Sequence, residues 1–509
     1  MSIARRAGKV HSFASGRIDV AGNSQSERSF SSPAGDGMRA LVWFRSDLRI
    51  SDNPALHHAC RSADEGVIAV FALCPQQWSD HSWGPMKVDF VLRNLRALHR
   101  SLSDINIPLM LVESPRFAAV PGKLLDIARR CKCSGLFFNR EYEVDERRRD
   151  EEVRKLFEKA GSSVYAFTDQ TILDVAAMRT TSDGWYTVFT PFKRKWLETV
   201  RDDGPLPICP RPRKQRPTGM RPDPLPGSVR GFVGPVRPDL WPEGEQAAQK
   251  RLRLFVSRRI EDYYVKRDRP AETRTSALSP YLACGVLSAR QCLAAAMETN
   301  DGRLDTGRKG VTTWISELIW REFYRHVLIG FPRVCMNRPF RLETERLAWR
   351  EDETQFRAWC EGRTGVPIVD AGMRQLAQTG WMHNRVRMIV AMFLTKDLFI
   401  DWRWGERHFM QHLVDGDLAS NNGGWQWSAS TGTDAAPYFR IFNPFNQSKR
   451  YDPDGEYIRR FVPELAAAPT GALHDADGIK SLGSRYPGLS LDRAASRARV
   501  LHAFKHLTR

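Results

Sequence analysis

The chain has 509 residues, more than a single hydrophobic core usually holds, which predicts two or more domains. Hydrophobic residues at 42% and charged residues at 27% are typical of a folded soluble protein, and no run of about 18 apolar residues predicts a membrane span. Lys and Arg number 77 against 59 acidic residues. The net charge of +18 favours nucleic acid as a partner, although a basic protein without such a partner would show the same balance.

The nine cysteines are scattered along the chain. The closest pair, Cys131 and Cys133, lacks a second pair or a nearby His at metal-ligand spacing. We therefore expect a reducing compartment, without a disulfide framework and without a metal site.

Residues 1–37 are rich in Ser, Arg and Gly and poor in acidic residues, which predicts a disordered extension. Organellar transit peptides share this composition. A dispensable extension, or translation that starts at Met38, explains the segment more simply, and no apolar stretch indicates secretion. We expect a cytoplasmic, nucleoid-associated protein, with organelle targeting as the alternative.

An α/β domain is predicted over residues 38–168. Apolar, β-branched runs alternate there with helical stretches such as Val88–Leu102 and Glu146–Ala160. Strands separated by helices indicate a parallel, Rossmann-like sheet that is covered on both faces. No GxGxxG follows the first strand, so we expect no dinucleotide bound in the Rossmann manner. The predicted strands are Ala40–Phe44, Val67–Leu73, Pro108–Val112, Gly135–Phe138 and Val164–Phe167.

Pro, Gly and Arg crowd residues 203–243, and we expect a linker over residues 169–244. Helical patterns dominate from Glu245 onward, and strand patterns cease. The predicted fold is therefore an α/β N-terminal domain followed by a larger all-α domain over residues 245–509.

The segment Trp314–Val327 has helical periodicity and two distinct faces. A solvent-exposed face would favour Lys, Glu and Gln, yet the second face has tryptophans beside one acid and one Arg. The apolar ridge expected in the core is Ile315, Ile319, Phe323 and Val327. The opposite face carries Trp314, Glu317, Trp320, Arg321 and Tyr324.

The segment Gly380–Leu394 repeats this design. Its second face suits a cavity that holds flat polar rings, or an interhelical contact in which Arg and Asn are hydrogen-bonded. Two such helices in one domain favour the cavity. The predicted core stripe is Val386, Ile389, Val390 and Phe393. The other face aligns Trp381, Asn384, Arg385 and Met388 at i, i+3, i+4 and i+7.

A third segment, Asp415–Trp427, combines two acids, the pair Gly423 and Gly424, and two tryptophans. Adjacent glycines permit close approach of the backbone to another group. We expect a loop here that closes on the same cavity. A structural turn would explain the glycines but not the whole set.

Five motifs carry a resemblance to a known family. They are LVWFRSDLRISDNPAL at 41–56, TSALSPYLACG at 275–285, WISELIWREFYRH at 314–326, GWMHNRVRM at 380–388 and DGDLASNNGGWQWSASTGTDAAPYFRIFNP at 415–444. Together they resemble the DNA photolyase and cryptochrome family, in particular the class I photolyases that act on cyclobutane pyrimidine dimers. The resemblance implies a light-driven lyase that repairs these dimers in DNA.

The resemblance also implies FAD, folded into a U shape in the helical domain. Hydroxyls ahead of a helix, as at Thr275, Ser276 and Ser279, suit a phosphate, although an ordinary N-cap needs only one of them. By resemblance Asn421 faces N5 of the flavin, where plant cryptochromes usually carry Asp. The implied FAD contacts are Tyr263, Thr275, Ser276, Ala277, Leu278, Ser279, Trp314, Arg321, Asn384, Arg387, Asp415, Gly416, Asp417 and Asn421.

For the lesion, the resemblance implies that Glu317 hydrogen-bonds to the bases of the dimer. A structural salt bridge is the alternative role for Glu317, which its tryptophan neighbours disfavour. The dimer must leave the stacked duplex, and a damaged pair unstacks at lower cost than an intact one. Photolyases for the six-four photoproduct carry His in this pocket, whereas this chain has Asn and Met. The other implied contacts to the lesion or DNA are Trp320, Trp427, Asn384, Arg385, Met388 and Arg440.

Trp425, Trp402 and Trp349 match the electron-transfer chain that runs from the flavin to the surface in this family. A tryptophan considered alone is more often a core residue. Only the matching motifs favour the electron-transfer role.

The resemblance implies an antenna chromophore, 5,10-methenyltetrahydrofolate, in contact with the first domain. The matching positions are His81, Asp145, Glu146 and Cys335. Asp145 replaces a usual Asn, and Met336 stands where a Lys is frequent.

Two other functions would share most of these motifs. A cryptochrome-type photoreceptor would bind FAD and signal without repair, but Asn421 and the short segment after Leu465 favour repair. A light-independent nucleic-acid binder with a vestigial flavin fold would stay colourless after incubation with FAD. One active site fits within one chain, so we expect a monomer that binds damaged DNA and no membrane.

Overall fold

The structure, a computed structural model, describes residues 37–434, 440–483, 486 and 491–508. By their contacts, residues Asp36–Arg509 form one unit. The predicted division into an α/β domain, a linker and a helical domain stays a prediction.

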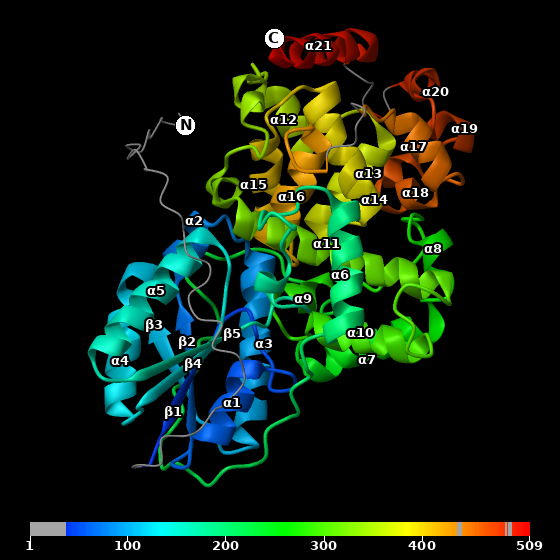
Figure 1. Ribbon diagram of the computed structural model, residues 1–509. Coiled ribbons are helices and arrows are strands. Elements are labelled where there is room, and N and C mark those ends of the chain that lie inside the picture. Colours follow the sequence, from blue (N-terminus) through cyan, green and yellow to red (C-terminus); the bar gives the residue numbers. More distant parts are fainter. Residues whose placement is uncertain (1–36, 435–439, 484–485, 487–490, 509) are drawn as a thin grey trace. The chain divides into compact units, whose positions relative to one another are not determined.

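The predicted parallel sheet is confirmed (Figure 1). Its strand order is β3-β2-β1-β4-β5, and each strand is parallel to its neighbours. Parallel strands require crossover connections, which helices supply on both faces. The strands are β1 (Ala40–Phe44), β2 (Val67–Leu73), β3 (Leu109–Glu113), β4 (Gly135–Asn139) and β5 (Ser163–Phe167). The helices around them are α1 (Pro54–Ser62), α2 (Pro75–Asp80), α3 (Pro85–Ser103), α4 (Val120–Arg130) and α5 (Val144–Lys159).

The central strand β1 is buried on both faces. Ala40, Val42 and Phe44 enter a core that includes residues of α1 and α3. Leu41 and Trp43 enter a second core with residues of α4 and α5. Because alternate side chains of a strand point to opposite faces, a strand covered on both faces needs a continuous apolar run.

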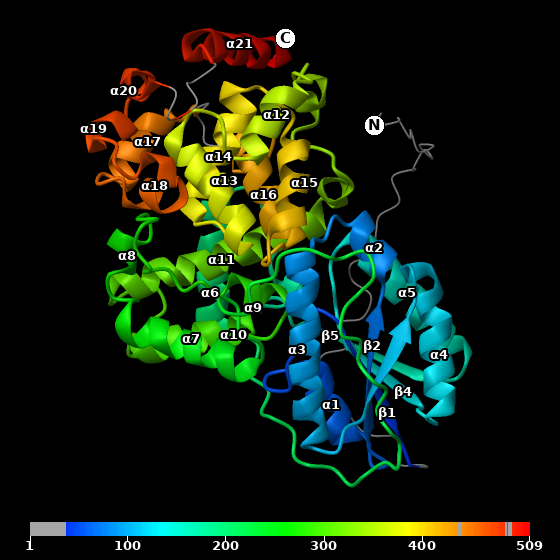
Figure 2. The same cartoon turned by 180° about the vertical axis from the view of Figure 1, so that it is seen from behind.

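After Glu245 the described residues form helices joined by turns and loops. The only β-bridge among them is an isolated one between Arg350 and Ile400. None of the described helices is long and apolar enough to cross a lipid bilayer. Figures 1 and 2 show this part from opposite sides. Its helices are α7 (Glu245–Arg258), α8 (Tyr263–Lys266), α9 (Ser279–Ala283), α10 (Ala289–Thr299), α11 (Lys309–Gly330), α12 (Glu353–Cys360), α13 (Pro367–Thr379), α14 (Asn384–Met392), α15 (Trp402–His412), α16 (Leu418–Ala429), α17 (Pro444–Tyr451), α18 (Glu456–Phe461), α19 (Thr470–Leu473), α20 (Ala476–Ser481) and α21 (Arg493–Lys505).

The range predicted as a linker contains a helix, α6 (Phe189–Asp203), which packs against α11. The part of this range after α6, residues 204–244, has neither helix nor strand. Gln215 holds it to the sheet, because the Gln215 side chain accepts from the N–H of Val67 at 2.8 Å and donates to its carbonyl at 2.9 Å.

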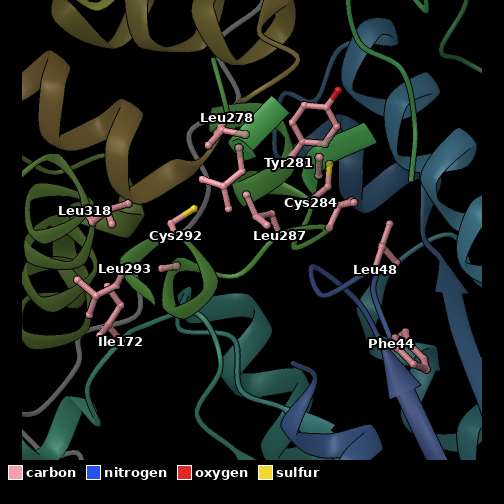
Figure 3. Close-up of a cluster of buried hydrophobic side chains, with 14 of the residues drawn as sticks. Phe44, Leu48, Ile172, Leu278, Tyr281, Cys284, Leu287, Cys292, Leu293 and Leu318 are labelled. Carbon is pink, nitrogen blue, oxygen red and sulfur yellow. The ribbon is translucent and has the colours of Figure 1, made fainter. Parts of the chain in front are cut away.

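The hydrophobic core beside β1 continues into the helical part. Figure 3 shows Leu48 between Phe44 of β1 and Cys284, and these residues belong to the same core as Tyr281, Leu287 and Leu293. A core that crosses the junction fixes the sheet against helices α9 to α11 by burial of apolar surface.

A buried ion network also crosses this junction. Arg290 of α10 lies 3.0 Å from Asp52 and 2.7 Å from Asp169, and Arg49 contacts Asp169 as well. These four side chains are at most 3% exposed. Paired charges in such a place are tolerated because each has a partner of opposite sign.

Candidate active site

Helix α11 presents an apolar ridge to the core and a mixed face to the site. The predicted ridge is confirmed, since all four of its residues are buried. Glu317, Trp320, Arg321 and Tyr324 of the opposite face are half-buried. Trp314 differs: it is 3% exposed and packs on Phe255 in the core, with ring centroids 4.9 Å apart.

The helical line predicted from Trp381 to Met388 is wrong at its start. Helix α13 ends at Gly380, a left-handed C-cap with a φ of 68°, and α14 begins only at Asn384. Trp381 precedes α14, and its Nε1 donates to Oγ of Ser279 at 3.2 Å. The predicted core stripe is confirmed, because Val386, Ile389, Val390 and Phe393 are at most 1% exposed.

The segment around Gly423 was expected to be a loop, but it forms α16. Asp417 caps this helix by accepting a hydrogen bond from the N–H of Ser420 at 2.9 Å, which offsets the low helix propensity of the glycines. A Cβ at Gly423 would lie 2.1 Å from the ring of Tyr324, so α16 packs closely on α11. A Cβ at Gly424 would meet nothing within 4 Å.

Asn421, Gly424 and Trp427 follow at intervals of three residues on α16, so together they span an arc of about 120° on one side of the helix. The Nδ2 of Asn421 donates to the backbone carbonyl of Glu406 at 3.0 Å, which fixes the amide. Glu406 itself accepts from Asn422 at 2.9 Å, and burial raises the pKa of Glu406 to about 7. This face therefore joins a fixed amide, open space and a half-buried indole.

Two Arg–Asp pairs contain the acids predicted near the flavin ring. Arg387 lies 2.8 Å from Asp415, and Arg325 lies 2.5 Å from Asp417. Burial alone would raise the pKa of Asp417, but Arg325 and Arg321 hold that pKa well below its usual range. Each acid is therefore held in place by a neighbouring guanidinium.

Arg321 forms no ion pair with any described carboxylate. Its Nη1 donates to the carbonyl of Gln170 at 2.7 Å, and burial, with Arg325 nearby, lowers its pKa to about 10. A half-buried cation that forms no direct ion pair favours an anionic ligand such as a phosphate.

The segment with the predicted phosphate contacts turns sharply at Ala277, whose φ of 48° lies in the left-handed region. Such a conformation is uncommon for a residue with a Cβ and occurs where the surroundings fix the backbone. Thr275 and Ser276 precede α9 as expected, whereas Ser279 is its first residue. Leu278 and Tyr263 are buried.

Two of the residues expected at the lesion, Glu317 and Arg385, form ion pairs with the adjacent residues Arg267 and Asp268. Arg267 donates to Glu317 at 2.6 Å, so Glu317 does belong to an ion pair, and Asp268 accepts from Arg385 at 2.9 Å. Burial nevertheless raises the pKa of Glu317. Among the other residues predicted at the lesion or DNA, Asn384 and Arg440 are exposed. The half-buried ones are Met388, Trp320 and Trp427.

The three tryptophans of the expected electron-transfer chain differ in depth. Trp425 and Trp402 are 2% and 1% exposed, and Trp349 is half-buried. A Cβ at Gly405 would lie 2.1 Å from the ring of Trp425, so α15, which begins at Trp402, packs directly on that indole. This order, from buried to accessible, suits transfer toward the surface.

The four residues predicted to contact an antenna line one cavity of about 420 Å³. Its wall combines residues of β1, β2, α5 and α15. His81 lies 3.2 Å from Asp145 and 3.4 Å from Glu146. Burial and the nearby Glu143 raise the pKa of Glu146, whose buried Oε2 forms no hydrogen bond within the described part of the chain. The cavity also reaches Asp417, the N-cap of helix α16.

Several residues of the site were missed from the sequence. Arg325 could have been found, because it follows Arg321 by one helical turn. Lys87, Arg267 and Phe189 gave no local signal, because their partners are distant in sequence. Lys87 illustrates this, because its Nζ donates to the carbonyl of Gly416 at 2.6 Å although the two residues are 329 positions apart in the sequence.

The residues present fit FAD. Arg321 offers a half-buried cation for a phosphate, Asn421 and the two Arg–Asp pairs offer fixed polar groups for a ring edge, and Gly424 leaves room for a planar group. The Nδ1 of His383 accepts from the N–H of Arg385 at 3.2 Å, whereas its buried Nε2 finds no hydrogen-bond partner among the described residues. A polar ligand would supply what such a group lacks.

Two family models match the chain. The model described as DNA photolyase covers residues 40–213, and the model described as the FAD binding domain of DNA photolyase covers residues 314–506. The chain therefore belongs to the DNA photolyase family.

Named relatives match nearly the whole chain. The deoxyribodipyrimidine photo-lyase of Vibrio cholerae is 44% identical over 473 residues, covering 91% of this chain and 99% of the relative. The enzyme of that name from Salmonella typhimurium is 47% identical over 436 residues, covering 86% and 91%. A bacterial class III photolyase from Agrobacterium tumefaciens has a similar crystal structure, with a TM-score of 0.80, 34% identity and coverage of 94% and 100%.

Proposed function

We propose that this chain is a deoxyribodipyrimidine photo-lyase that uses FAD and light to split cyclobutane pyrimidine dimers in DNA. The observation that carries the proposal is one broad side of α16, where Asn421, Gly424 and Trp427 place a fixed amide, open space and an indole within an arc of about 120°. An amide beside space for a ring, next to an indole for a base, suits a flavin and an extruded lesion together.

When bound, reduced FAD would supply, on excitation, the electron that opens the cyclobutane ring, and would take it back afterwards. Arg321 would bind its phosphates, with Thr275 and Ser276 near the turn at Ala277. Asn421, held by the Glu406 carbonyl, would orient the ring edge. In the Arg387–Asp415 and Arg325–Asp417 pairs each carboxylate is balanced by an Arg, so neither pair would add net charge beside the ring. The work of the protein is orientation and the exclusion of water.

On the lesion side, Glu317 would hydrogen-bond to the dimer and Trp320 and Trp427 would stack on it. Arg267 holds the Glu317 carboxyl group at 2.6 Å, so the side chain is already oriented for a hydrogen bond to the bases. Arg385 and exposed Arg440 would bind the DNA backbone, which the net charge of +18 supports.

The cavity that holds His81, Asp145, Glu146 and Cys335 would bind an antenna, and 5,10-methenyltetrahydrofolate remains our proposal for it. A protonated Glu146 and its free Oε2 suit the polar edge of a heterocycle. The substitutions at Asp145 and Met336 alter two contacts of that site. We further propose a monomer that acts on DNA in the nucleoid.

The deciding experiment illuminates the chemically reduced protein with an oligonucleotide that contains one thymine dimer. We expect restoration of intact thymines in light and none in the dark. Binding of the oligonucleotide without restoration would instead favour a cryptochrome-type photoreceptor, and a protein that stays colourless with FAD would exclude both functions.

A further inference from the structure

Helix α6 supports the lesion-facing side of α11 through two contacts in register. The ring of Phe189 stacks on Trp320 with centroids 3.6 Å apart and an interplanar angle of 7°. One turn along α6, the Nζ of Lys193 donates to Oγ of Ser316 at 2.6 Å. Ser316 lies one turn before Trp320, so the two helices run antiparallel with these positions paired.

The indole of Trp320 is fixed on several sides. Phe323 contacts it edge-on at 5.7 Å, and Tyr324 lies at 5.7 Å with a tilt of 36°. Phe189 covers one face of the indole, yet the side chain stays half-buried. The accessible remainder is the surface on which a base can stack.

The start of α6 is also tied to the residue that ends the described segment after α16. The carboxylate of Asp434 accepts from the N–H of Phe189 at 3.2 Å, and the N–H of Asp434 donates to the carbonyl of Thr187 at 3.2 Å. Phe189 therefore links the position of Trp320 to the chain that leaves the flavin-facing helix.

We infer that Phe189 is a positioning residue for lesion recognition, which fixes the Trp320 indole in the plane that stacks on an extruded pyrimidine dimer. The inference rests on the proposed function. Phe189 lies within residues 40–213, which the DNA photolyase model matches, and outside residues 314–506, which the FAD-binding model matches. An aromatic wall that is ordered before binding lowers the entropy cost of stacking, and this benefit applies to damaged DNA alone.

The test compares Phe189→Leu and Phe189→Met, which remove the ring but keep apolar bulk, with Phe189→Tyr, which keeps the ring. For the two ring-less variants we expect the Kd for a dimer-containing duplex to rise about two- to tenfold, the range of an aromatic pair. The Kd for undamaged duplex and the flavin absorption spectrum should match the parent, whereas the melting temperature should fall by a few degrees because Phe189 is buried in the core. Phe189→Tyr should bind dimer DNA as the parent does.

A double-mutant cycle with Trp320→Leu separates positioning from a general structural role. In the Trp320→Leu background, Phe189→Leu should change dimer binding no further. Additive losses in the cycle, equal losses on undamaged DNA, or parental dimer binding by both ring-less variants would each overturn the inference. If the parent protein does not restore thymines, the proposed function is wrong. If the parent repairs dimers and the ring-less variants bind dimer DNA as it does, only this inference is wrong.

Discussion

At the scale of single residues, the polar groups of the site are fixed by the backbone as much as by one another. Asn421 donates to the carbonyl of Glu406, Asp417 accepts from the N–H of Ser420, and His383 accepts from the N–H of Arg385. Side chains that are already oriented lose little entropy when a ligand binds. The site is therefore preorganised for a rigid, planar ligand.

Replacing Trp425 by Phe should block light-driven reduction of oxidised flavin. Phenylalanine fills most of the buried volume but is far harder to oxidise than indole. Repair by chemically reduced enzyme should stay within about twofold of the parent, because the proposed role of this residue is to carry electrons to the surface and not to contact the lesion. Flash spectroscopy and a repair assay measure the two activities, with half-buried Trp185→Phe as the matched control. Equal loss of both activities would refute the electron-transfer role.

Glu406 should make stability depend on pH. Its pKa in the folded chain is raised from 4.5 to about 7, so stability is fully present below pH 4.5 and decreases as pH rises toward 7, by about 3 kcal/mol at most. Glu406→Gln keeps an acceptor for Asn422 and removes the ionisation. The melting temperature of the variant relative to the parent should therefore rise between pH 5 and pH 8. A difference that stays constant over that range would contradict the burial effect.

At the scale of elements, periodicity predicted the core-facing sides of α11 and α14 correctly, because apolar spacing depends on one helix alone. The start of α14 was misplaced since the left-handed turn at Gly380 interrupts a pattern that looks continuous in sequence. Helix α16 was expected to be a loop because two glycines disfavour a helix locally. The helix forms because Asp417 caps its N-terminus and because Gly423 packs against Tyr324 of α11, a tertiary contact that the local sequence does not show.

The two adjacent glycines of α16 should respond differently to a methyl group. Gly424→Ala places a Cβ in open space, so the melting temperature of the FAD-free chain should stay unchanged or rise slightly, whereas FAD affinity should fall about tenfold or more. Gly423→Ala would force the Tyr324 ring away and should lower the melting temperature itself. Thermal unfolding with and without FAD separates the two effects. Unchanged FAD affinity in Gly424→Ala would place the flavin elsewhere.

The ion network at the junction should be sensitive to loss of one partner. Arg290→Met leaves Asp52 and Asp169 buried with less positive charge, which should cost about 3 to 5 kcal/mol. Arg253→Met, at an exposed position of α7, serves as the control and should change stability by less than about 0.5 kcal/mol. Denaturant unfolding of both variants measures this difference. Similar midpoints would show that the network contributes little.

At the scale of the whole molecule, DNA binding should weaken steeply with salt. The excess of Lys and Arg gives +18, and each phosphate neutralised should add about 0.9 to the slope of log Kd against log salt. Arg440→Gln should lower that slope by about one and weaken damaged and undamaged duplex alike. Titrations at several salt concentrations test both statements. A flat salt dependence would remove the electrostatic contribution.

The order of the architecture along the chain was predictable, because each strand and helix carries its own pattern. Pairings between distant segments were not, since Arg290 with Asp169 or Phe189 with Trp320 leave no local trace. The residues of the site were named through resemblance, and the structure adds which of them are held, and by what. Arg440 lies beside residues 435–439, which are outside the described part of the chain.

The place of α6 in the chain has a consequence for biosynthesis. During translation this helix leaves the ribosome roughly a hundred residues before α11, the helix on which Phe189, Phe192 and Trp196 find their burial. Its aromatic side chains therefore stay exposed to solvent while the ribosome synthesises the residues between α6 and α11. The nascent chain is most exposed to chaperones and to aggregation in that interval, and synthesis that pauses between α6 and α11 should lower the yield of folded protein.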